Sequence, residues 1–559
     1  MLKNGNWAMV AGLLISGAIT RPVSAQVQFH SALGSVKYSG CSDVKNSDFT
    51  SVSLVTKAKV PDLFEPTRFA IAKSGRIFFA ERNGGVRVVE IDGSIKQIGS
   101  VNIFPTTNTI PGNNELGLVG LQLDPNFDAT GFIYLIYQPP TPAITKVSRF
   151  KVNGQIMDMA SEQVILSLPN QRSYCCHTGG SMQFDNKGDL WISIGNNTRN
   201  SSDANGYVDE SSPDKDDQAH SANTNDYRGK ILRIHPLVSA GTDGKFYTIP
   251  SGNLKEYYAS MWSATDMAKV LPEIYTMGHR SNYTLTVDTA KGWLTWGDIG
   301  PDEGRQTEEL NITTKPGYFG WPYFAGSKRT DAADPYAYKP ALNKDDAAPV
   351  NTSPNNTGVQ KLPPAIPATF GYKQAAAVTG PIYHWSAAQT NQKRLPPHFD
   401  GKWLVTDFNI GELQVATLDA NANLTGRVTL FDGLTRPLQI VVGPDGVLYT
   451  LEYASSFFVT DGKTAIKRWD YTGPACQGTG LAEEQATKAR LKPNSILLNL
   501  DLGSKRSLEI PAGKTGIGLY DVQGKEIWDF NSHSGATSRG FIVDIPESVP
   551  HGLYRVLFR

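Results

Sequence analysis

Three polar side chains stand directly ahead of apolar, alternating segments, at positions that a strand pattern does not require. Glu115 precedes LGLVGLQLDPNF, His177 precedes TGGSMQF, and Arg280 lies in GHRSN ahead of another apolar segment. A histidine and an arginine that face each other supply what the oxidation of an alcohol needs: a base for the hydroxyl proton and a fixed cation for developing negative charge. The sequence therefore offers a candidate pair, provided that the fold brings the two side chains together.

His177 lies in SYCCHTGGSMQF, where it could be a catalytic base, a metal ligand or a turn residue. A zinc site is not indicated, because Cys175, Cys176 and His177 are consecutive and lack the spacing that lets three ligands face one ion. Gly179 and Gly180 follow the histidine and are expected to leave room for a bound molecule. The base and the turn residue remain as interpretations of His177.

The segments that must position these residues repeat along the chain. An apolar strand, a turn rich in Gly, Asp or Asn, and a second apolar strand recur as six copies. Strands of alternating pattern around such turns are hairpins, and six such sheets arranged radially form a propeller. The copies begin at FAIAKSGRIFF (69), GLQLDPNF (120), GSMQFDNKG (180), YTLTVDTAKG (283), GKWLVTDFN (401) and LQIVVGPDG (438).

The predicted fold is thus all-β, a six-bladed β-propeller; a sandwich built from unrelated hairpins is the alternative. In a propeller the entrances of the innermost strands line the central funnel, so Glu115, His177 and Arg280 are expected to converge there. The long insertions 196–228 and 323–380 are expected to be loops that crowd one face.

Charge and the first residues bear on partners and localisation. The 559 residues include 53 Lys and Arg against 53 Asp and Glu, so no net field attracts nucleic acid. Residues 1–25 hold Lys3, an apolar run and VSA before Gln26, which predicts a signal peptide. That run is shorter than the roughly 20 residues that span a bilayer, and no later segment approaches this length. A secreted, periplasmic or cell-surface protein without a transmembrane segment is expected.

Four cysteines in an exported chain favour disulfides over metal sites. The simplest of the three possible connectivities pairs Cys41 with Cys476 across the main domain and joins Cys175 to Cys176 as a vicinal bridge. The chain contains no CxxCH motif for haem attachment and no GxSxG motif of a serine hydrolase. A cytochrome partner would therefore be a separate protein.

The pattern changes after the propeller, which is assigned to residues 26–475. A polar linker, 476–492, leads to a module at 493–559 whose short alternating strands and QG turn predict a small β-sandwich. The segments YDVQGK (520–525) and PHGLYRV (550–556) resemble the C-terminal sorting domain of type IX secretion cargo. That resemblance implies delivery to the cell surface; the alternative is a sandwich that merely packs or binds carbohydrate.

Residues of about 60–470 resemble the glucose/sorbosone dehydrogenase family, soluble six-bladed propeller quinoproteins that use pyrroloquinoline quinone (PQQ). CCHTGG together with SPNNTG looks like a branch of secreted, PQQ-dependent sugar dehydrogenase-like proteins. The matching blocks occur in the family's order: ELGLVGLQLDPNF, HTGGSMQFDNKGDLWISIGNN, RGKILRI, EIYTMGHRSN, GDIGPDE, EELN and GYFGWPYFAG.

The resemblance implies a role for each matching position. His177 falls on the catalytic base, and Arg280 on the arginine that contacts the quinone oxygen. Glu115 takes the place of a glutamine near the cofactor. Gly300 and Pro301 match the pair whose backbone carbonyls hold the Ca²⁺ bound to PQQ, which suits a cation that prefers oxygen ligands.

Other positions match in part. Arg436 falls on an arginine that binds a cofactor carboxylate, where bidentate pairing is favourable. Asn409 replaces a cofactor-binding lysine, and Leu438 replaces a second arginine. Ser281 and Asn282 stand where the family has asparagine and proline.

The resemblance therefore predicts an exported, PQQ- and Ca²⁺-dependent dehydrogenase that oxidises a hydroxyl of a sugar or polyol. A separate electron acceptor, such as a cytochrome or a quinone, would complete the reaction. The missing cations at 409 and 438 favour the rival hypothesis, a non-catalytic propeller that binds carbohydrate or protein at the cell surface.

Overall fold

The computed structural model describes residues 44–105, 115–174, 176–199, 207–301, 308–328, 336–373 and 375–474, together with six strands between 495 and 558. The chain divides into two compact units on either side of residue 476. The predicted signal peptide and linker lie outside the described residues. Among the residues that are described, no helix is long and apolar enough to cross a membrane.

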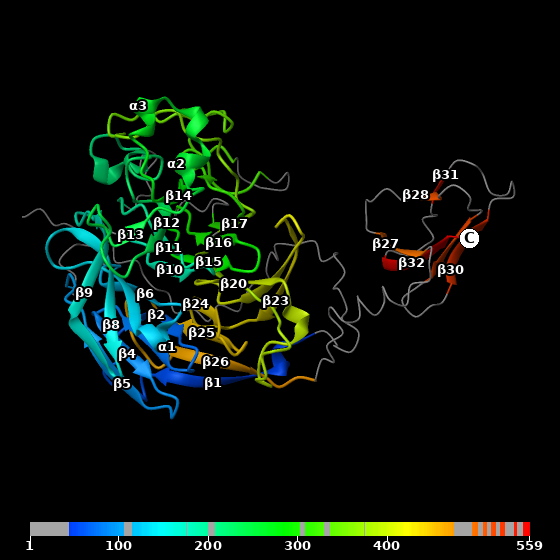
Figure 1. The fold of residues 1–559 in the computed structure, drawn as a ribbon, viewed down its shortest axis with the longest axis horizontal. Helices are drawn as coiled ribbons and strands as arrows, with labels where there is room; N and C mark the ends of the chain where they lie inside the picture. The colour runs from blue at the N-terminus through cyan, green and yellow to red at the C-terminus, as the bar shows by residue number, and fades with distance from the viewer. Residues whose placement is uncertain are drawn as a thin grey trace, which may run out of the picture. The chain divides into compact units, whose positions relative to one another are not determined.

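The first unit consists of six antiparallel sheets arranged as blades (Figure 1). Blade one holds β2 (Pro66–Ile71), β3 (Ile77–Glu81), β4 (Gly85–Val89) and β5 (Ile95–Ser100). Blade two holds β6 (Leu118–Leu123), β7 (Phe132–Tyr137), β8 (Ile144–Asn153) and β9 (Ile156–Pro169). Blade three holds β10 (Ser181–Phe184), β11 (Leu190–Ile194), β12 (Lys230–Pro236), β14 (Ile274–Met277) and the parallel β18 (Gly317–Tyr318), with β13 (Tyr247–Thr248) beside β12.

Blade four holds β15 (Thr284–Asp288), β16 (Trp293–Asp298), β17 (Glu308–Thr313) and β19 (Phe370–Tyr372). Blade five holds β20 (Ala377–Ile382), β21 (Lys402–Asp407), β22 (Leu413–Leu418) and β23 (Leu424–Phe431). Blade six holds β24 (Pro437–Val442), β25 (Leu448–Glu452), β26 (Ala465–Tyr471) and β1 (Phe49–Thr56). The helical segments are short: α1 (Phe127–Thr130), α2 (Leu254–Tyr257), α3 (Ala264–Met267), η1 (Asn46–Asp48), η2 (Pro213–Lys215), η3 (Asp217–Ala219), η4 (Ala259–Met261) and η5 (Pro397–Phe399).

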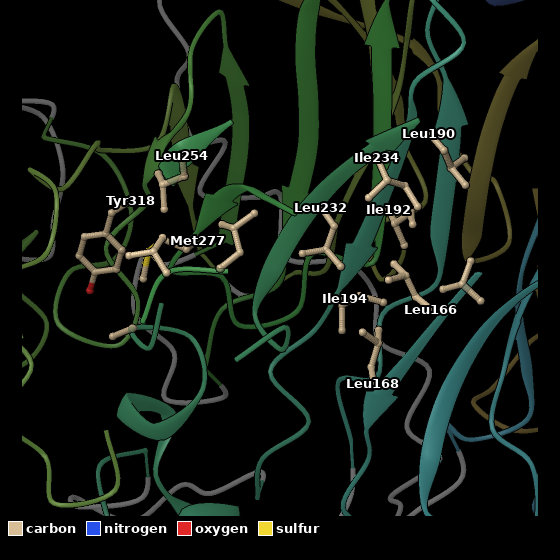
Figure 2. Close-up of a cluster of buried hydrophobic side chains, with 14 of the residues drawn as sticks. Leu166, Leu168, Leu190, Ile192, Ile194, Leu232, Ile234, Leu254, Met277 and Tyr318 are labelled. Carbon is tan, nitrogen blue, oxygen red and sulfur yellow. The ribbon is translucent and has the colours of Figure 1, made fainter. Parts of the chain in front are cut away.

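The innermost strands close a ring, which confirms the predicted six-bladed propeller. β2, β6, β10, β15, β20 and β24 each contact the innermost strands of both neighbouring blades. Apolar clusters fill the space between blades. Figure 2 shows one of these clusters, in which Leu166 and Leu168 of β9 lie near Ile192 and Ile194 of β11. Burial between the sheets therefore fixes the position of each inner strand.

Among the strands that the sequence analysis did not place, β20 and β1 matter most for the ring. The fifth copy was placed from residue 401, but its inner strand is β20, at the end of the segment predicted as an insertion. Gly380 and Pro381 interrupt the strand pattern there, and the register shifts between Thr379 and Ile382. β1 completes blade six by pairing with β26, with Phe49 opposite Tyr471. Figure 1 shows β1 beside β26.

Phe49 anchors this closing strand and provides a test of its importance. Its ring makes edge contacts with Phe399, Phe431 and Tyr471 at centroid distances of 6.2, 5.1 and 5.4 Å. Phe49→Ala is expected to lower the free energy of unfolding by about 3–5 kcal/mol, because it opens a cavity between β1 and blade five. Urea denaturation measures the loss, with the exposed Thr50→Ala as the control. Equal effects of the two changes would show that β1 does not stabilise the ring.

The second unit contains two antiparallel sheets. One has the order β27 (Ser495–Leu500), β32 (Gly552–Phe558), β29 (Gly516–Tyr520) and β30 (Glu526–Asn531); the other pairs β28 (Ser507–Ile510) with β31 (Phe541–Asp544). β29 and β30 form the hairpin expected around the QG turn. The sandwich packing and the sorting role stay predictions.

Candidate active site

The topology brings the predicted site residues to one edge of the blades. Glu115 precedes β6, His177 precedes β10, Arg280 precedes β15, and Arg436 directly precedes β24. All four strands are innermost, a position that the sequence analysis expected for Glu115, His177 and Arg280. The second strand of each antiparallel hairpin ends beside the start of the first, so residues that follow a second strand reach the same edge.

Gly300, Pro301 and Asn409 are such residues. Gly300 and Pro301 follow β16, whose Gly297 is paired with Thr284 at the start of β15. Asn409 follows β21, which runs antiparallel to β20 in the same way. The hairpins therefore place these three positions at the rim that carries the inner-strand entrances.

Glu115 holds the backbone of His177. Its Oε2 accepts the His177 backbone N–H at 2.5 Å, and its carboxyl also accepts the N–H of Thr178. Burial raises the pKa of Glu115, while these hydrogen bonds and the charge of Arg280 oppose the rise. His177 has a φ of 57°, a left-handed conformation that a histidine adopts only under constraint. The carboxyl of Glu115 supplies part of that constraint.

Glycines make the rest of this turn possible. A Cβ on Gly195 would lie 2.2 Å from the carbonyl oxygen of His177, and one on Gly179 would lie 2.6 Å from the Gly195 nitrogen. A Cβ on Gly180 would lie 2.6 Å from the carbonyl oxygen of Val119. Gly179 and Gly180 were expected to leave room for a ligand; instead they allow the backbone of blade three to pack closely.

The imidazole of His177 is neutral and buried. The side chain is 7% exposed, and Nδ1 lies 3.0 Å from Oδ1 of Asn196. Burial, followed by the charge of Arg280, holds the pKa of His177 well below its ordinary value of 6.5. A base must be unprotonated to accept a proton, so the environment of this imidazole suits the role predicted for it.

Cys176, next to His177, is disulfide-bonded. It is the one cysteine among the described residues, so its predicted bridge to Cys175 and the predicted pair of Cys41 with Cys476 both involve residues outside them.

Arg280 is 2% exposed and its guanidinium has a fixed position. Its backbone N–H donates to both carboxylate oxygens of Asp298, at 3.1 and 3.3 Å. Nη1 donates to the carbonyl oxygens of Ile299, at 3.0 Å, and Gly300, at 2.6 Å. The guanidinium lies 5.3 Å from the ring centre of Tyr207. A permanent cation is thereby held against the turn predicted to bind Ca²⁺.

The positions that were predicted to differ from the family pattern, Ser281, Asn282 and Leu438, make contacts within the fold. The backbone N–H of Ser281 donates to Asp298 at 2.7 Å, and Asn282 Nδ2 donates to the carbonyl oxygen of Lys230 at 2.9 Å. Leu438 is 9% exposed and packs in an apolar cluster of blades one, five and six. No cation is available at this position.

Arg436 and Asn409, which lie at the same rim as the inner-strand entrances, contact each other. Arg436 Nη1 donates to Asn409 Oδ1 at 2.9 Å. The guanidinium lies 4.5 Å from the ring centre of Phe457 and 5.4 Å from that of Phe408. Arg436 also has a left-handed backbone, with φ of 48°. Asn409, which was predicted to replace a cofactor-binding lysine, thus orients Arg436.

Arg82 contacts residues that neighbour both Glu115 and Arg436. Its Nη1 donates to the carbonyl oxygen of Leu116, next to Glu115, at 3.3 Å. Its guanidinium lies 5.7 Å from the ring centre of Phe458, which is 6.2 Å from the ring of Phe457 beside Arg436. The predicted residues therefore form two neighbouring groups, His177 with Glu115, Arg280 and Gly300, and Arg436 with Asn409.

Sequence reasoning missed Asn196, Asp298 and Glu308. Asn196 and Asp298 lie at the ends of second strands, so the hairpin rule used above would have pointed to them. Glu308 begins β17 and accepts the N–H of Gly300 at 3.2 Å. Burial and the charge of Asp407 raise the pKa of Glu308 well above its ordinary value.

The fold and the site define a six-bladed propeller with a buried histidine, His177, and a buried arginine, Arg280, at one rim. A family model described as glucose/sorbosone dehydrogenase matches residues 63–457. The chain therefore belongs to the glucose/sorbosone dehydrogenase family. This membership confirms the resemblance found in the sequence and the class of enzyme it implies, a sugar dehydrogenase.

Individual relatives are distant. Quinoprotein glucose dehydrogenase B of Acinetobacter calcoaceticus is 25% identical over 466 residues, which cover 72% of this chain and 91% of that protein. An uncharacterised protein of Synechocystis is 26% identical over 297 residues, covering 51% of this chain and 63% of that protein. The soluble aldose sugar dehydrogenase of Escherichia coli has a similar fold, with a TM-score of 0.51 and 18% identity over 76% of this chain and 99% of that chain.

Proposed function

We propose that this protein oxidises a hydroxyl group of a sugar or polyol, using PQQ and Ca²⁺, outside the cytoplasm. The proposal rests on the buried imidazole of His177, whose pKa is lowered by burial and by the charge of the fixed guanidinium of Arg280, in a chain of this family. The name of the Acinetobacter relative, a quinoprotein, supports the choice of cofactor. Residues 1–25 and the tail motifs support export.

The donor atoms at the rim fit such a cofactor. The carbonyl oxygens of Gly300 and Pro301 are hard ligands of the kind that Ca²⁺ prefers. Arg280 and Arg436 are two guanidiniums suited to the quinone oxygen and to a carboxylate. In this structure the Gly300 carbonyl accepts a hydrogen bond from Arg280. A cation bound by that carbonyl would direct the arginine toward another acceptor, which a quinone provides.

Different residues of the chain have different roles in the proposed reaction. His177 takes the proton of the substrate hydroxyl, while the carbon bearing that hydroxyl loses a hydride and becomes a carbonyl carbon. PQQ, when bound, supplies the acceptor for the hydride. Glu115 keeps the backbone of His177 in place, and Arg280 stabilises negative charge that develops nearby. A separate acceptor, such as a cytochrome or a quinone, then removes the electrons.

Cofactor uptake by the wild type and by Arg280→Ala tests the proposal. The purified full chain is mixed with PQQ and Ca²⁺, and bound PQQ is measured by absorbance and mass after removal of excess. We expect uptake by the wild type, weaker uptake by Arg280→Ala, and dye reduction with at least one aldose. The matched control is Arg468→Ala, since Arg468 pairs with Asp470 on the outer part of blade six. Equal uptake by wild type and Arg280→Ala would show that the proposed cofactor site is wrong.

The second candidate, a non-catalytic carbohydrate-binding or protein-binding propeller, is favoured by the neutral Asn409 and the apolar surroundings of Leu438. Absence of PQQ binding together with absence of turnover across a sugar panel would support this candidate instead.

A further inference from the structure

Asp217, which the proposed function does not use, is a fully buried carboxylate whose side-chain contacts are donors. It begins η3 and is 0% exposed. Its Oδ2 accepts the amide N–H of Asn196 at 2.8 Å and the indole N–H of Trp321, and its Oδ1 accepts the hydroxyl of Thr198. Burial raises the pKa of Asp217 to about 7, although the hydrogen bonds from Thr198 and Trp321 and the charge of Arg280 lower it.

These donors keep Oδ2 of Asp217 an acceptor in either protonation state. An indole N–H can only donate, so Oδ2 must accept from Trp321. A proton on Asp217 would therefore occupy Oδ1, where the Thr198 hydroxyl can accept it. The amide of Asn196 must then present Nδ2 to Asp217 and Oδ1 to His177.

A second contact gives the same orientation independently. The backbone N–H of Thr198, which can only donate, lies 3.4 Å from Oδ1 of Asn196. Because Oδ1 of Asn196 is an acceptor, Nδ1 of His177 at 3.0 Å must carry a hydrogen. A neutral imidazole has a single N–H, so Nε2 of His177 carries the lone pair.

We propose that Asn196 and Asp217 are positioning residues that hold His177 in the Nδ1-protonated tautomer, so that Nε2 is the atom that accepts the substrate proton. The role of Nε2 rests on the proposed function, whereas the tautomer does not. The charged groups that face His177 leave this assignment intact: Glu115 receives its backbone N–H, and Arg280 disfavours protonation of the ring.

The use of an amide between His177 and Asp217 has a chemical consequence. A carboxylate in direct contact with Nδ1 would fix the same tautomer but would also stabilise the imidazolium ion. The neutral oxygen of Asn196 fixes the tautomer with less stabilisation of the charged ring. The arrangement therefore selects Nε2 as the acceptor and keeps the base unprotonated.

The tautomer can be read directly from ¹⁵N spectra of PQQ-free protein labelled at histidine, with the His177 signals assigned by their loss in His177→Gln. We expect a protonated Nδ1 and an unprotonated Nε2 in the wild type. Asn196→Leu removes the acceptor and is expected to give a mixture of tautomers or the Nε2-protonated form. Asp217→Asn can still offer an oxygen to Asn196 and is expected to keep the wild-type tautomer, whereas Asp217→Ala is expected to give a mixture.

Asp216→Ala is the matched control, since Asp216 is equally buried in the same loop but contacts Gln218 and Ser353 instead. In Asp216→Ala, the tautomer of His177 is expected to match that of the wild type. An Nε2-protonated wild type, or an unchanged tautomer in Asn196→Leu, would overturn the proposal. If Asp217→Ala does not fold, Asn196→Leu still decides.

Turnover separates this inference from the proposed function. In the reconstituted enzyme, Asn196→Leu is expected to lower kcat by about tenfold with little change in KM, because the tautomer affects proton transfer rather than binding. A wild type that is inactive with every sugar yet shows the Nδ1-protonated ring would contradict the proposed function and support the tautomer assignment.

Discussion

Replacing His177 by glutamine is expected to lower the turnover of the reconstituted enzyme by about 10²- to 10⁴-fold, the usual contribution of a general base. Glutamine keeps much of the volume and polarity of the imidazole but cannot take the hydroxyl proton at neutral pH. PQQ uptake is expected to persist, since Arg280 and Arg436 remain. Steady-state dye reduction measures kcat, and absorbance measures bound cofactor.

The matched control is His235→Gln, because His235, on β12, pairs with Asp189 and its side chain is 42% exposed. This variant is expected to keep wild-type turnover. A His177→Gln enzyme that binds PQQ and retains full turnover would exclude His177 as the base.

The same assignment fixes the direction of the pH dependence. A base works while it is unprotonated, so kcat/KM falls as the pH drops through its pKa. Burial and the charge of Arg280 lower the pKa of His177. We therefore expect the acidic limb of the profile to lie below pH 6.5 in the wild type.

A large loss of stability is also expected for Arg82→Met. Arg82 Nε and Nη2 donate to the two carboxylate oxygens of Glu65 at 2.6 and 3.0 Å, and the side chains are 6% and 4% exposed. Removing the arginine leaves a buried, uncompensated carboxylate, which is expected to cost about 3–5 kcal/mol. The hydroxyl of Tyr453, which donates to the same carboxylate at 2.6 Å, does not replace the lost charge. Urea denaturation provides the free energy of unfolding.

Arg76→Met is the matched control, because Arg76 makes a comparable two-point contact with Glu90 at 3.0 and 3.0 Å in a more exposed place. We expect a loss within about 1 kcal/mol, as for pairs nearer the surface. The double variant Glu65→Leu, Arg82→Met is expected to recover part of the stability, since neither charge then remains buried alone. Similar losses for Arg76→Met and Arg82→Met would contradict the argument from burial.

The fold could be predicted from the sequence wherever the pattern lies within a few neighbouring residues. Each hairpin is marked by alternating apolar residues around a turn, so six blades could be predicted from neighbouring residues. β1 could not, because its mixed pattern becomes meaningful only when it pairs with β26, far along the chain. β20 was hidden because Gly380 and Pro381 interrupt its pattern.

The candidate site also contains residues that the sequence predicted and residues that it missed. His177, Arg280 and Glu115 were found because a polar residue ahead of an apolar strand is visible in the sequence. Asn196 follows the second strand of its hairpin and could have been found by that position, whereas Asp217 was missed because its contact with Asn196 depends on the path of a long loop between β11 and β12. No local pattern distinguishes Asp217 from its neighbour Asp216, although one faces the amide beside His177 and the other does not.

The pairing of β1 with β26 also bears on how the molecule folds. Residues 49–56 must find residues 465–471 before blade six has its outer strand, and contacts between such distant segments form slowly. The other blades are assembled from segments that are closer in sequence, so they can form while the ring is still open. Blade six is therefore expected to be completed late in folding, after the local hairpins of the other blades have formed.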